Sequence, residues 1–481
     1  MRVLQVCAEI YPLLKTGGLA DVAGALPAAL QGAGVEVRVL LPGFDAVMAG
    51  LKDPVAVGEL APHGAVPGAR LLYGELTAVG CHAYVVDAPA LYQRPGGPYA
   101  DAQQQPYADN HLRFARLGWA AAELAGGIDG YWRPELVHAH DWHAALAPAC
   151  MKAMGVPVAS VFTIHNLAYQ GSFDARHFGE LGLPLHFFNP EGLEFHGALN
   201  FMKAGLFYAD RISTVSPTYA HEIQSPEQGM GLDGLLRRRA GVLHGILNGV
   251  DEAVWNPAKD PLITAAYDGL KLTGKGRNKA ALQKLLGLAP VPDVPLFVVV
   301  SRLTEQKGLH LVLETLPKLA ARGGQFALLG NGDAGMEAAF RDLASRWPDS
   351  VGVHIGYDES LAHQMVAGGD VIMVPSRFEP CGLTQLYGLR YGALPLVRRV
   401  GGLADTVTDC SLEALDEGRA TGFVFDAFSE EGLDAAVRRA FALYRRRRDW
   451  VSVQRTAMAQ HHDWAVAAQG YLAMYRAALG R

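Results

Sequence analysis

The sequence predicts an α/β protein of two domains, each built on a parallel sheet that is buried on both faces. With 481 residues the chain is too long for one small module, since domains average about 150 residues. Short apolar runs alternate with amphipathic stretches along its whole length, which is typical of strands and helices in turn. The 55 glycines exceed the average usage of about 7% and show no period, which favours many tight turns over a collagen-like or linker sequence.

The first series of apolar runs predicts the strands of an N-terminal domain. A helix is predicted between the first two runs. After Gly18, apolar residues recur at spacings of three and four as far as Leu30, and Gly32 follows as a stop. The predicted strands are residues 3–6, 35–41, 82–86, 136–139, 158–164 and 211–215.

A second series predicts the strands of a C-terminal domain, joined to the first near residue 248. From about Glu430 the pattern becomes helical with no further strand, and the arginines at 445–448 are interpreted as a solvated helix face. The fragment GGLAD occurs at 17–21 and again at 401–405, each time after a predicted strand, which is consistent with an internal duplication. The predicted strands are residues 296–300, 326–329, 353–355, 371–374 and 394–397.

Charge and cysteine usage exclude several classes of protein. The balance of 42 Lys and Arg against 48 Asp and Glu gives a net charge of −6, so bulk charge predicts no nucleic-acid partner. The five cysteines are odd in number and lack C-x-x-C spacing, which argues against a disulfide framework or a structural zinc site. No apolar run approaches the roughly 18 residues of a membrane span, and charges interrupt the N-terminus before a signal-peptide core is complete. We expect a soluble, cytoplasmic protein without a membrane partner.

The first candidate site is the segment 15–19 (KTGGL), at the turn between the first predicted strand and the first helix. Gly17 and Gly18 would let backbone N–H groups approach an anion at the positive end of the helix dipole, and Lys15 would add a full charge. The alternative is an ordinary tight turn, because neither the dinucleotide-binding pattern nor the P-loop pattern is matched.

The second candidate is the segment 138–143 (HAHDWH), at the end of another predicted strand. On a strand, His138 and His140 share one face while His143 lies beyond it, so a metal site is one interpretation. The others are a structural role and a polar cluster that lines a binding site, with Asp141 hydrogen-bonded to a sugar. His165 follows the next strand and should reach the same edge of the sheet.

The third candidate is a pair of cations in the segment 298–308. A buried strand is followed by Arg302 and Lys307, five residues apart in a loop, which suits the recognition of a diphosphate. The alternative is a pair of surface charges. Two such cations without a carboxylate partner would repel each other unless an anion were bound.

The fourth candidate follows the strand at 371–374 and contains Glu379. Beyond it, the backbone amides of Gly382 and Leu383 and the hydroxyl of Thr384 form a helix start suited to phosphate. The alternative for Glu379 is an acidic residue that offsets a helix dipole. Cys381 has no obvious base near it in sequence, so a nucleophilic role is not expected.

Six motifs in order resemble the bacterial glycogen synthase family, which includes plant starch synthases. That family has the GT-B fold, in which two Rossmann-like domains with parallel sheets face each other across a deep cleft. The resemblance implies an acceptor-side domain at 1–247, a nucleotide-sugar domain at 248–456 and a helix at 457–481 that returns to the N-terminal domain. The motifs span the whole chain: KTGGL at 15–19, HDWH at 140–143, TIHNL at 163–167, ILNGVD at 246–251, SRLTEQKG at 301–308 and EPCGLTQ at 379–385.

The resemblance also implies an activity and a set of site residues. The implied enzyme is a retaining hexosyltransferase that moves glucose from ADP-glucose to the non-reducing 4-hydroxyl of an α-1,4-glucan, in glycogen biosynthesis and without a cofactor. Glu379 matches the catalytic glutamate, and Tyr357 matches the residue that stacks on adenine. Lys15, Arg302 and Lys307 would contact the diphosphate or the transferred sugar. The other residues implied in sugar or phosphate binding are Asp21, Asp141, His165, Asn248, Gly382, Leu383 and Thr384.

The sequence departs from related patterns at two positions, and its chemistry leaves one question open. Tyr387 stands at the second position of the E-x7-E pattern, so ribose contacts must come from elsewhere, and Val400 replaces the threonine of a second T-G-G-L motif. Arg302 and Lys307 can stabilise the leaving diphosphate as a metal does in other transferases, so no metal is expected. Retention could use Glu379 as a covalent nucleophile. We favour a same-face attack in which the departing phosphate takes the acceptor proton.

Three rival functions predict different features. A sucrose- or trehalose-type transferase on the same fold would use a small acceptor and elongate no polymer. A nicotinamide-dependent dehydrogenase would need G-x-G-x-x-G and an acidic residue about 20 positions later, which the first strand–helix turn lacks. A glucan-binding protein without catalysis is disfavoured because the candidate catalytic residues are all present.

Overall fold

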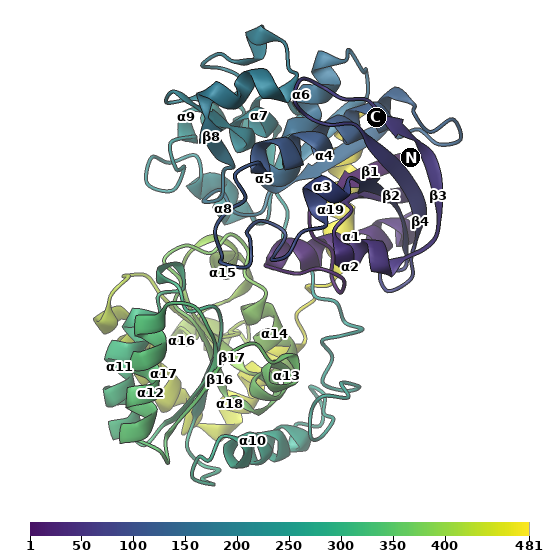
Figure 1. The fold of residues 1–481 in the computed structure, drawn as a ribbon. Coiled ribbons are helices and arrows are strands. Elements are labelled where there is room, and N and C mark those ends of the chain that lie inside the picture. The colour runs from purple at the N-terminus through teal and green to yellow at the C-terminus, as the bar shows by residue number, and fades with distance from the viewer. Residues whose placement is uncertain (481) are drawn as a thin grey trace. The chain divides into compact units, whose positions relative to one another are not determined.

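The computed structural model describes residues 1–480, which form two compact units (Figure 1). The first unit comprises Met1–Gly249 and the residues from Trp464 on, and the second comprises Val250–Asp463. Asn248 therefore belongs to the first unit, and residues 457–463 belong to the second.

Within the described residues, a nine-stranded sheet forms the centre of the first unit. The strands from β12 to β5 run parallel, and β4 and β3 add an antiparallel edge. Sequence patterning missed β3 because most of its side chains are exposed, so it has no continuous apolar run. Across the sheet the strands are β12 (Leu243–Gly245), β11 (Arg211–Thr214), β7 (Ala159–Ile164), β6 (Leu136–His140), β1 (Arg2–Val6), β2 (Glu36–Pro42), β5 (Cys81–Asp87), β4 (Ala69–Leu76) and β3 (Leu51–Leu60).

Both faces of this sheet are buried, as the apolar runs predict. Val3 of β1 packs in a cluster with α1 and α19, while its neighbour Leu4 packs in a separate cluster with α4 and α6. A small antiparallel sheet joins β8 (Ser172–Asp174), β10 (Ala198–Asn200) and β9 (Glu194–Phe195). The helices of the unit are α1 (Gly18–Gly32), α2 (Asp45–Gly50), α3 (Pro89–Tyr92), α4 (Asn110–Gly126), α5 (Asp141–Ala144), α6 (Leu146–Ala153), α7 (Phe201–Tyr208), α8 (Pro217–Glu222), α9 (Asp233–Arg238) and α19 (Trp464–Ala478), with short 3-10 turns η1 (Ala175–Leu181), η2 (Leu185–Phe187) and η3 (Ala240–Val242).

The last helix, α19, packs on the first unit although it follows the second in sequence (Figure 1). Its buried residues Tyr471 and Tyr475 share an apolar cluster with Val22 and Leu26 of α1. The hydroxyl of Tyr475 also lies 2.7 Å from Nδ1 of the buried His138 on β6. The helix therefore completes both the apolar core and the polar core of the unit.

The second unit is built on a six-stranded sheet, counted over the described residues, in which every strand pair is parallel. In order across the sheet, its strands are β15 (Val351–Ile355), β14 (Gln325–Gly330), β13 (Leu296–Val300), β16 (Val371–Val374), β17 (Leu394–Arg398) and β18 (Phe423–Phe425). Its helices are α10 (Thr273–Leu285), α11 (Leu309–Ala321), α12 (Ala334–Arg346), α13 (Glu359–Gly368), α14 (Thr384–Tyr391), α15 (Gly401–Thr406), α16 (Leu412–Asp416), α17 (Glu430–Tyr444) and α18 (Arg447–Met458), with the 3-10 turn η4 (Glu305–Lys307).

Each sheet has one point at which the direction of strand order reverses. In the first unit the strands after β1 are added on one side of it, beginning with β2, and the later strands are added on its other side, beginning with β6. In the second unit β13 and β16 are the corresponding neighbours. Ligands of open α/β sheets bind beyond the carboxyl ends of the strands at such points, because the chain leaves the two central strands in opposite directions.

The candidate sites follow from this topology. The segment 15–19 lies after β1 and Asp141 lies directly after β6, so both fall at the reversal point of the first unit. Lys307 follows β13 and Glu379 follows β16, so both fall at the reversal point of the second unit.

None of the helices within residues 1–480 is long and apolar enough to cross a membrane.

Replacing Tyr475 by Phe should lower the free energy of unfolding by about 1–3 kcal/mol, because Nδ1 of His138 stays buried and loses its partner. Urea or thermal denaturation measures the change. Tyr131→Phe is the matched control, since the side chain of Tyr131 is fully exposed. Equal stabilities for the two variants would show that the contact between Tyr475 and His138 does not stabilise the unit.

Candidate active site

A buried glutamate that the sequence analysis missed holds the glycine loop of the first unit. The backbone N–H groups of Thr16 and Gly17 donate to Glu9 Oε2 at 2.6 and 3.3 Å, and the Thr16 hydroxyl donates to Oε1 at 2.5 Å. Tyr99 donates its hydroxyl to the same carboxylate. Glu9 is only 2% exposed, so these donors rather than water satisfy its carboxyl oxygens. The only signal for this role in the sequence is that an acidic residue follows shortly after the first apolar strand.

Lys15 and Asp21 are brought together by the turn from β1 into α1. Lys15 Nζ lies 2.8 Å from Asp21 Oδ1 and 5.3 Å from the centre of the Tyr11 ring. A Cβ atom built on Gly17 or Gly18 would meet no described atom within 4 Å. The glycine surface is therefore open to a ligand, and the lysine beside it is a partly exposed cation.

Asp141 and His165 meet at the carboxyl ends of β6 and β7. Asp141 has a left-handed backbone (φ 57°), which turns its carboxylate towards the next strand. Its Oδ1 accepts hydrogen bonds from the backbone N–H groups of His165 at 2.9 Å and Asn166 at 3.4 Å. Burial raises the pKa of Asp141 to about 7, and these two hydrogen bonds only partly offset that effect.

The histidines of the segment 138–143 form part of a buried polar network. His138 Nε2 lies 2.6 Å from the Thr163 hydroxyl, and His140 Nδ1 lies 3.0 Å from His165 Nε2. Burial lowers the pKa of His138 and of His165 to about 3 and that of His140 well below its usual value, so all three rings are neutral at pH 7. His143 is also buried and stacks on Tyr99 at 4.4 Å.

These ring contacts favour a structural role for His138, one of the interpretations of the histidine motif. Within the described part of the chain, the histidines at 138, 140 and 143 do not form a cluster of three converging ligand atoms. His138 is fully engaged with its neighbours, whereas His165 is placed at the rim of the sheet. Asn248 is a further buried group of this unit, and its Oδ1 has no hydrogen-bond partner among residues 1–480.

In the second unit an ion pair joins the two strands at the reversal point. Lys307 Nζ donates to Glu379 Oε2 at 2.6 Å, and the buried Ser376 hydroxyl donates to the same oxygen at 2.8 Å. The carboxylate is 7% exposed and the lysine side chain is 21% exposed. Arg302 is exposed, and its guanidinium has no hydrogen bond or ion pair to a described residue. The loop after β13 therefore offers one cation held by a carboxylate and one that can reach a ligand.

The loop that carries Glu379 is fixed by the repeated glycine pair, a role that the sequence analysis did not foresee. Gly402 N donates to the Glu379 carbonyl at 3.2 Å. A Cβ atom on Gly401, which has φ 42°, would lie 1.9 Å from the same carbonyl oxygen, and one on Gly402 would lie 2.2 Å from the Cys381 carbonyl oxygen. Only glycines allow this close approach of two backbone segments.

The start of α14 and the turn after β15 complete the set of predicted positions. Gly382 has φ 74°, and Leu383 is the residue before the first turn of α14, with no side-chain cap. Thr384 begins the helix, so the leading N–H groups face outward from the helix end. Tyr357 is 73% exposed, and its hydroxyl donates to Glu359 on α13.

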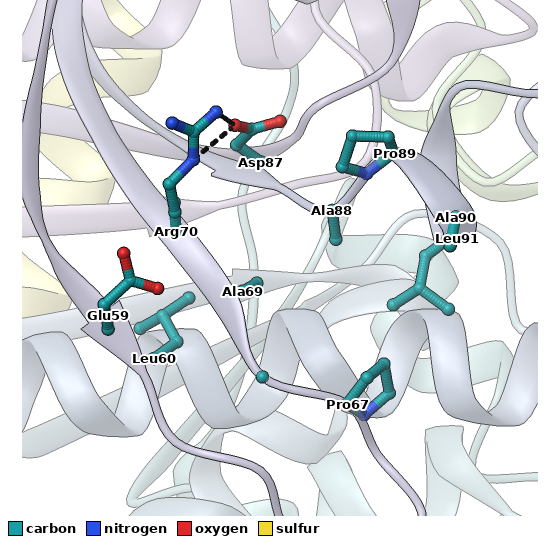
Figure 2. Close-up of a pocket in the computed structure, with 11 residues that line it drawn as sticks. Glu59, Leu60, Pro67, Ala69, Arg70, Asp87, Ala88, Pro89, Ala90 and Leu91 are labelled. Atoms are coloured by element: carbon teal, nitrogen blue, oxygen red, sulfur yellow. Dashed lines mark hydrogen bonds and ion pairs between the residues drawn. The ribbon is translucent and has the colours of Figure 1, made fainter.

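Two other clusters of the first unit lie apart from these residues. A surface pocket is bordered by β3, β4 and α3, where Arg70 reaches Asp87 with Nε at 3.0 Å from Oδ2 (Figure 2). None of the predicted site residues lines it.

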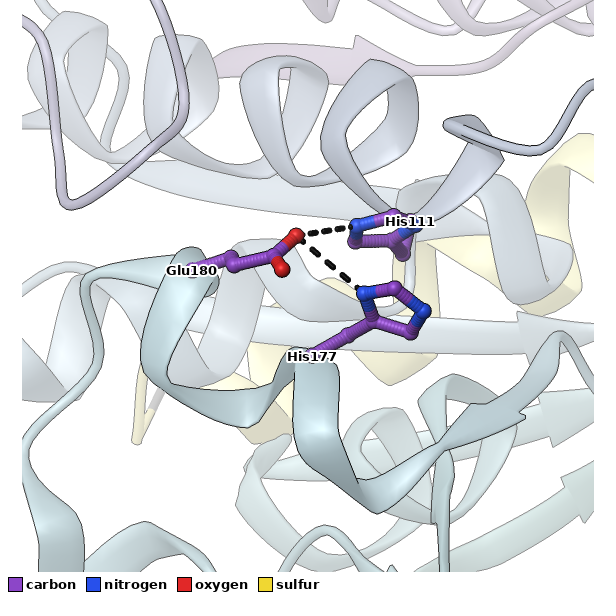
Figure 3. Close-up of side chains that lie close together, drawn as sticks. All are labelled: His111, His177 and Glu180. Atoms are coloured by element: carbon purple, nitrogen blue, oxygen red, sulfur yellow. Dashed lines mark hydrogen bonds and ion pairs between the residues drawn. The ribbon is translucent and has the colours of Figure 1, made fainter.

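The other cluster consists of two histidines and a glutamate whose side chains point towards one another (Figure 3). Glu180 Oε2 lies 2.7 Å from His111 Nε2 and 3.2 Å from His177 Nδ1, and these contacts lower the pKa of Glu180. The outer nitrogen of each ring lacks the acceptor that normally supports a metal-binding histidine, since His111 Nδ1 has no described partner and Arg176 donates to His177. We describe the cluster as a carboxylate that links α4 to η1.

Comparison with known proteins assigns the class of this fold. Residues 2–238 match the family described as the starch synthase catalytic domain, and residues 288–456 match glycosyl transferases group 1. The structure superposes on the catalytic domain of Starch Synthase IV from Arabidopsis thaliana bound to ADP and acarbose, with a TM-score of 0.90 and 31% identity over 100% of this chain and 99% of that one. A sucrose-phosphate synthase from Thermosynechococcus elongatus shares the fold at 16% identity and a TM-score of 0.60. The protein is a glycosyltransferase of the GT-B fold.

Sequence relatives narrow this class to one family. The chain is 63% identical to a glycogen synthase of Leptothrix cholodnii and 58% identical to one of Serratia proteamaculans, in each case over 99% of both chains. The chain belongs to the bacterial glycogen synthase family. Its activity is the transfer of glucose to a glucan.

Replacing Asp141 by Asn should remove a pH-dependent loss of stability in the ligand-free protein. The pKa of about 7 in the folded state lies above the value of about 3.9 for an exposed aspartate. Between these values the unfolded chain binds fewer protons at this residue than the folded chain, so wild-type stability falls as pH rises. The amide keeps an oxygen for the two backbone donors and tolerates a positive φ.

The expected result is that the stability of Asp141→Asn relative to wild type increases between about pH 5 and about pH 8, measured by urea denaturation. Asp53→Asn is the control, because Asp53 also has a positive φ (47°) but is exposed. If the relative stability of Asp141→Asn does not change with pH, Asp141 is not the buried acid that the structure indicates.

Proposed function

We propose that this enzyme takes glucose from ADP-glucose and adds it to the non-reducing 4-hydroxyl of an α-1,4-glucan with retention of configuration, in glycogen biosynthesis. The observation that carries the proposal is the pair Lys307 and Glu379 at the reversal point of the second sheet. The similar catalytic domain of Starch Synthase IV from Arabidopsis thaliana, which is bound to ADP and acarbose, supports a nucleoside diphosphate and a sugar chain as ligands.

The proposed diphosphate site uses cations and helix N–H groups in place of a metal ion. Arg302 and Lys307 follow β13, and the backbone N–H groups of Gly382 and Leu383, directly before α14, lie beside the Thr384 hydroxyl at its start. Breaking the bond between C1 and the phosphate oxygen increases the negative charge on ADP, so donors already fixed in place lower the barrier. We expect transfer to continue in the presence of a chelator.

Glu379 is assigned a positioning and electrostatic role. Its Oε2 accepts hydrogen bonds from Lys307 and Ser376, which stabilise the carboxylate and reduce its nucleophilicity. The contact also fixes the Lys307 ammonium where the leaving phosphate would need it. This supports the same-face attack, in which the departing phosphate takes the proton of the acceptor hydroxyl.

The first unit is assigned the acceptor and sugar contacts. Asp141, His165 and Asn248 are buried groups that follow the strands β6, β7 and β12, and the side-chain oxygen of Asn248 can accept a hydrogen bond from a sugar hydroxyl. Lys15 and Asp21 flank the open surface of Gly17 and Gly18.

In the second unit we assign Tyr357 to the adenine, because its ring is exposed while its hydroxyl is hydrogen-bonded to Glu359. Each cysteine within the described residues is a free thiol, which fits the reducing cytoplasm proposed as its location.

Replacing Glu379 by Gln should lower kcat by about 10²- to 10³-fold, as the loss of a fixed transition-state contact does in other enzymes. The assay mixes purified protein with glycogen and either ADP-glucose or UDP-glucose and follows nucleotide release and chain growth. Glu305→Gln is the control, because Glu305 lies in the loop that carries Lys307 but is 75% exposed. The proposal fails if neither donor supports transfer, or if Glu379→Gln is as active as wild type.

A second variant tests whether the glycine pair positions Glu379. Gly401→Ala places a Cβ atom 1.9 Å from the Glu379 carbonyl oxygen, so the loop must move and kcat should fall by about 10²-fold. Gly418→Ala is the control, because Gly418 also has a positive φ (67°) but open space around it. Similar activities for the two variants would mean that backbone strain, and not the position of Glu379, explains any loss.

A further inference from the structure

A buried aromatic stack lies beside the proposed adenine residue and has no role in the function proposed above. The indole of Trp255 is parallel to the ring of His363 at 3.7 Å and to the ring of Tyr387 at 3.8 Å, with interplanar angles of 13° and 8°. Two rings at this distance from one indole must lie on its opposite faces. The stack therefore fixes the plane of the His363 ring, which is 1% exposed.

One edge of the His363 ring is anchored in the core of the second unit. Its Nδ1 lies 2.7 Å from Oδ2 of Asp260, a side chain with no exposed surface. The Tyr391 hydroxyl donates to the same oxygen at 2.6 Å. With the ring plane set by Trp255 and this edge set by Asp260, the direction of the other nitrogen is determined.

The other edge of the ring faces the residue that holds Tyr357. His363 Nε2 lies 3.5 Å from Oε1 of Glu359, which is within ion-pair distance but is not a hydrogen bond, and the two residues are one turn apart on α13. The other oxygen of Glu359 accepts the Tyr357 hydroxyl. An unbroken series of contacts thus runs from the buried Asp260 through His363 and Glu359 to the exposed ring of Tyr357.

We propose that His363 is a positioning residue for the nucleotide base: it holds Glu359 in the orientation that fixes the Tyr357 ring for stacking on adenine. The inference rests on the proposed function, because it assumes that Tyr357 binds the base. Glu359 is about one third exposed, so without His363 its side chain loses one of the contacts that restrict its rotamers. The Tyr357 ring would then no longer be fixed in one orientation. Binding of adenine would have to order the ring, and the lost conformational freedom would weaken the affinity.

The charges around His363 support this role. Burial lowers the pKa of His363, but the charges of Glu359 and Asp260 and the hydrogen bond to Asp260 outweigh it, and the pKa is raised above its ordinary value. When the ring carries a second proton, it attracts both carboxylates. Packing alone does not require a histidine with two acidic neighbours. Nor does it require that histidine to lie between the buried Asp260 and the residue that contacts Tyr357.

Two amide variants separate the two edges of the ring. His363→Asn places its amide near the position of Nδ1 and retains a donor to Asp260, whereas His363→Gln places its amide near Nε2 and retains a donor to Glu359. The KM for ADP-glucose and the Kd for ADP should rise by about 3- to 10-fold in His363→Asn and less in His363→Gln. The KM for glycogen and kcat should change little in either variant. Tyr357→Phe, which removes the hydroxyl that Glu359 holds, should match His363→Asn.

The double variant and a stability control keep the test independent of folding. Tyr357→Phe combined with His363→Asn should be no weaker than either single variant, because both interrupt one series of contacts. Tyr391→Phe removes a buried hydrogen bond to Asp260 but leaves His363, Glu359 and Tyr357 in place. It should lower the melting temperature without changing the KM for ADP-glucose.

The outcomes distinguish this inference from the proposed function. If Tyr357→Ala leaves the Kd for ADP unchanged, Tyr357 does not bind the base, and both the adenine assignment and this inference are wrong. If Tyr357→Ala weakens ADP binding by at least about 5-fold while His363→Asn binds as wild type does, the assignment stands and the inference is overturned. A His363→Asn variant that raises the KM for glycogen as much as that for ADP-glucose also overturns it, because the effect is then a general loss of structure.

Discussion

The burial of parallel sheets on both faces is the constraint on which the rest of this structure depends. A strand that is covered by helices on each side can carry few polar side chains along its length, so polar and charged groups collect where the strands end. Because parallel strands end at the same edge, those groups come together without being near in sequence. Lys307 and Glu379 are 72 positions apart yet form an ion pair, since β13 and β16 are neighbours.

The two units use this edge in opposite electrostatic ways. In the first, the buried groups are an acid with a raised pKa and histidines held neutral by burial, so the edge suits hydrogen bonding to uncharged hydroxyl groups. In the second, Arg302, Lys307 and the start of α14 would present positive charge to the proposed diphosphate. The proposed ligands, a neutral glucan and a charged nucleotide sugar, would need these two kinds of surface. The net charge of −6 is summed over the whole chain, so it does not reveal this difference between the two units.

The repeated fragment GGLAD shows that one sequence can serve two structural purposes. Around Gly17 and Gly18 the space is open, and the loop is held from beneath by Glu9. Around Gly401 and Gly402 the space is filled by the backbone of the Glu379 loop. The fragment favours a strand-to-helix turn in both places, and the neighbouring loop determines whether the glycines face open space or support another part of the chain.

The sequence by itself determined the α/β class, most of the strands, the helix after Gly18 and the positions at which polar residues leave the strands. These features are local, because they depend on apolar runs and on glycines that the backbone requires at turns. The tertiary structure alone decided that Glu9 holds the first loop, that the glycines at 401 and 402 hold Glu379, that the exposed strand β3 joins the sheet, and that His363 lies between Asp260 and Glu359. Each of these depends on which groups the folded chain brings into contact, whether they are near in sequence, as Glu9 and Thr16 are, or far apart, as Asp260 and His363 are. The free energy of such a contact exists only when the fold has placed both partners.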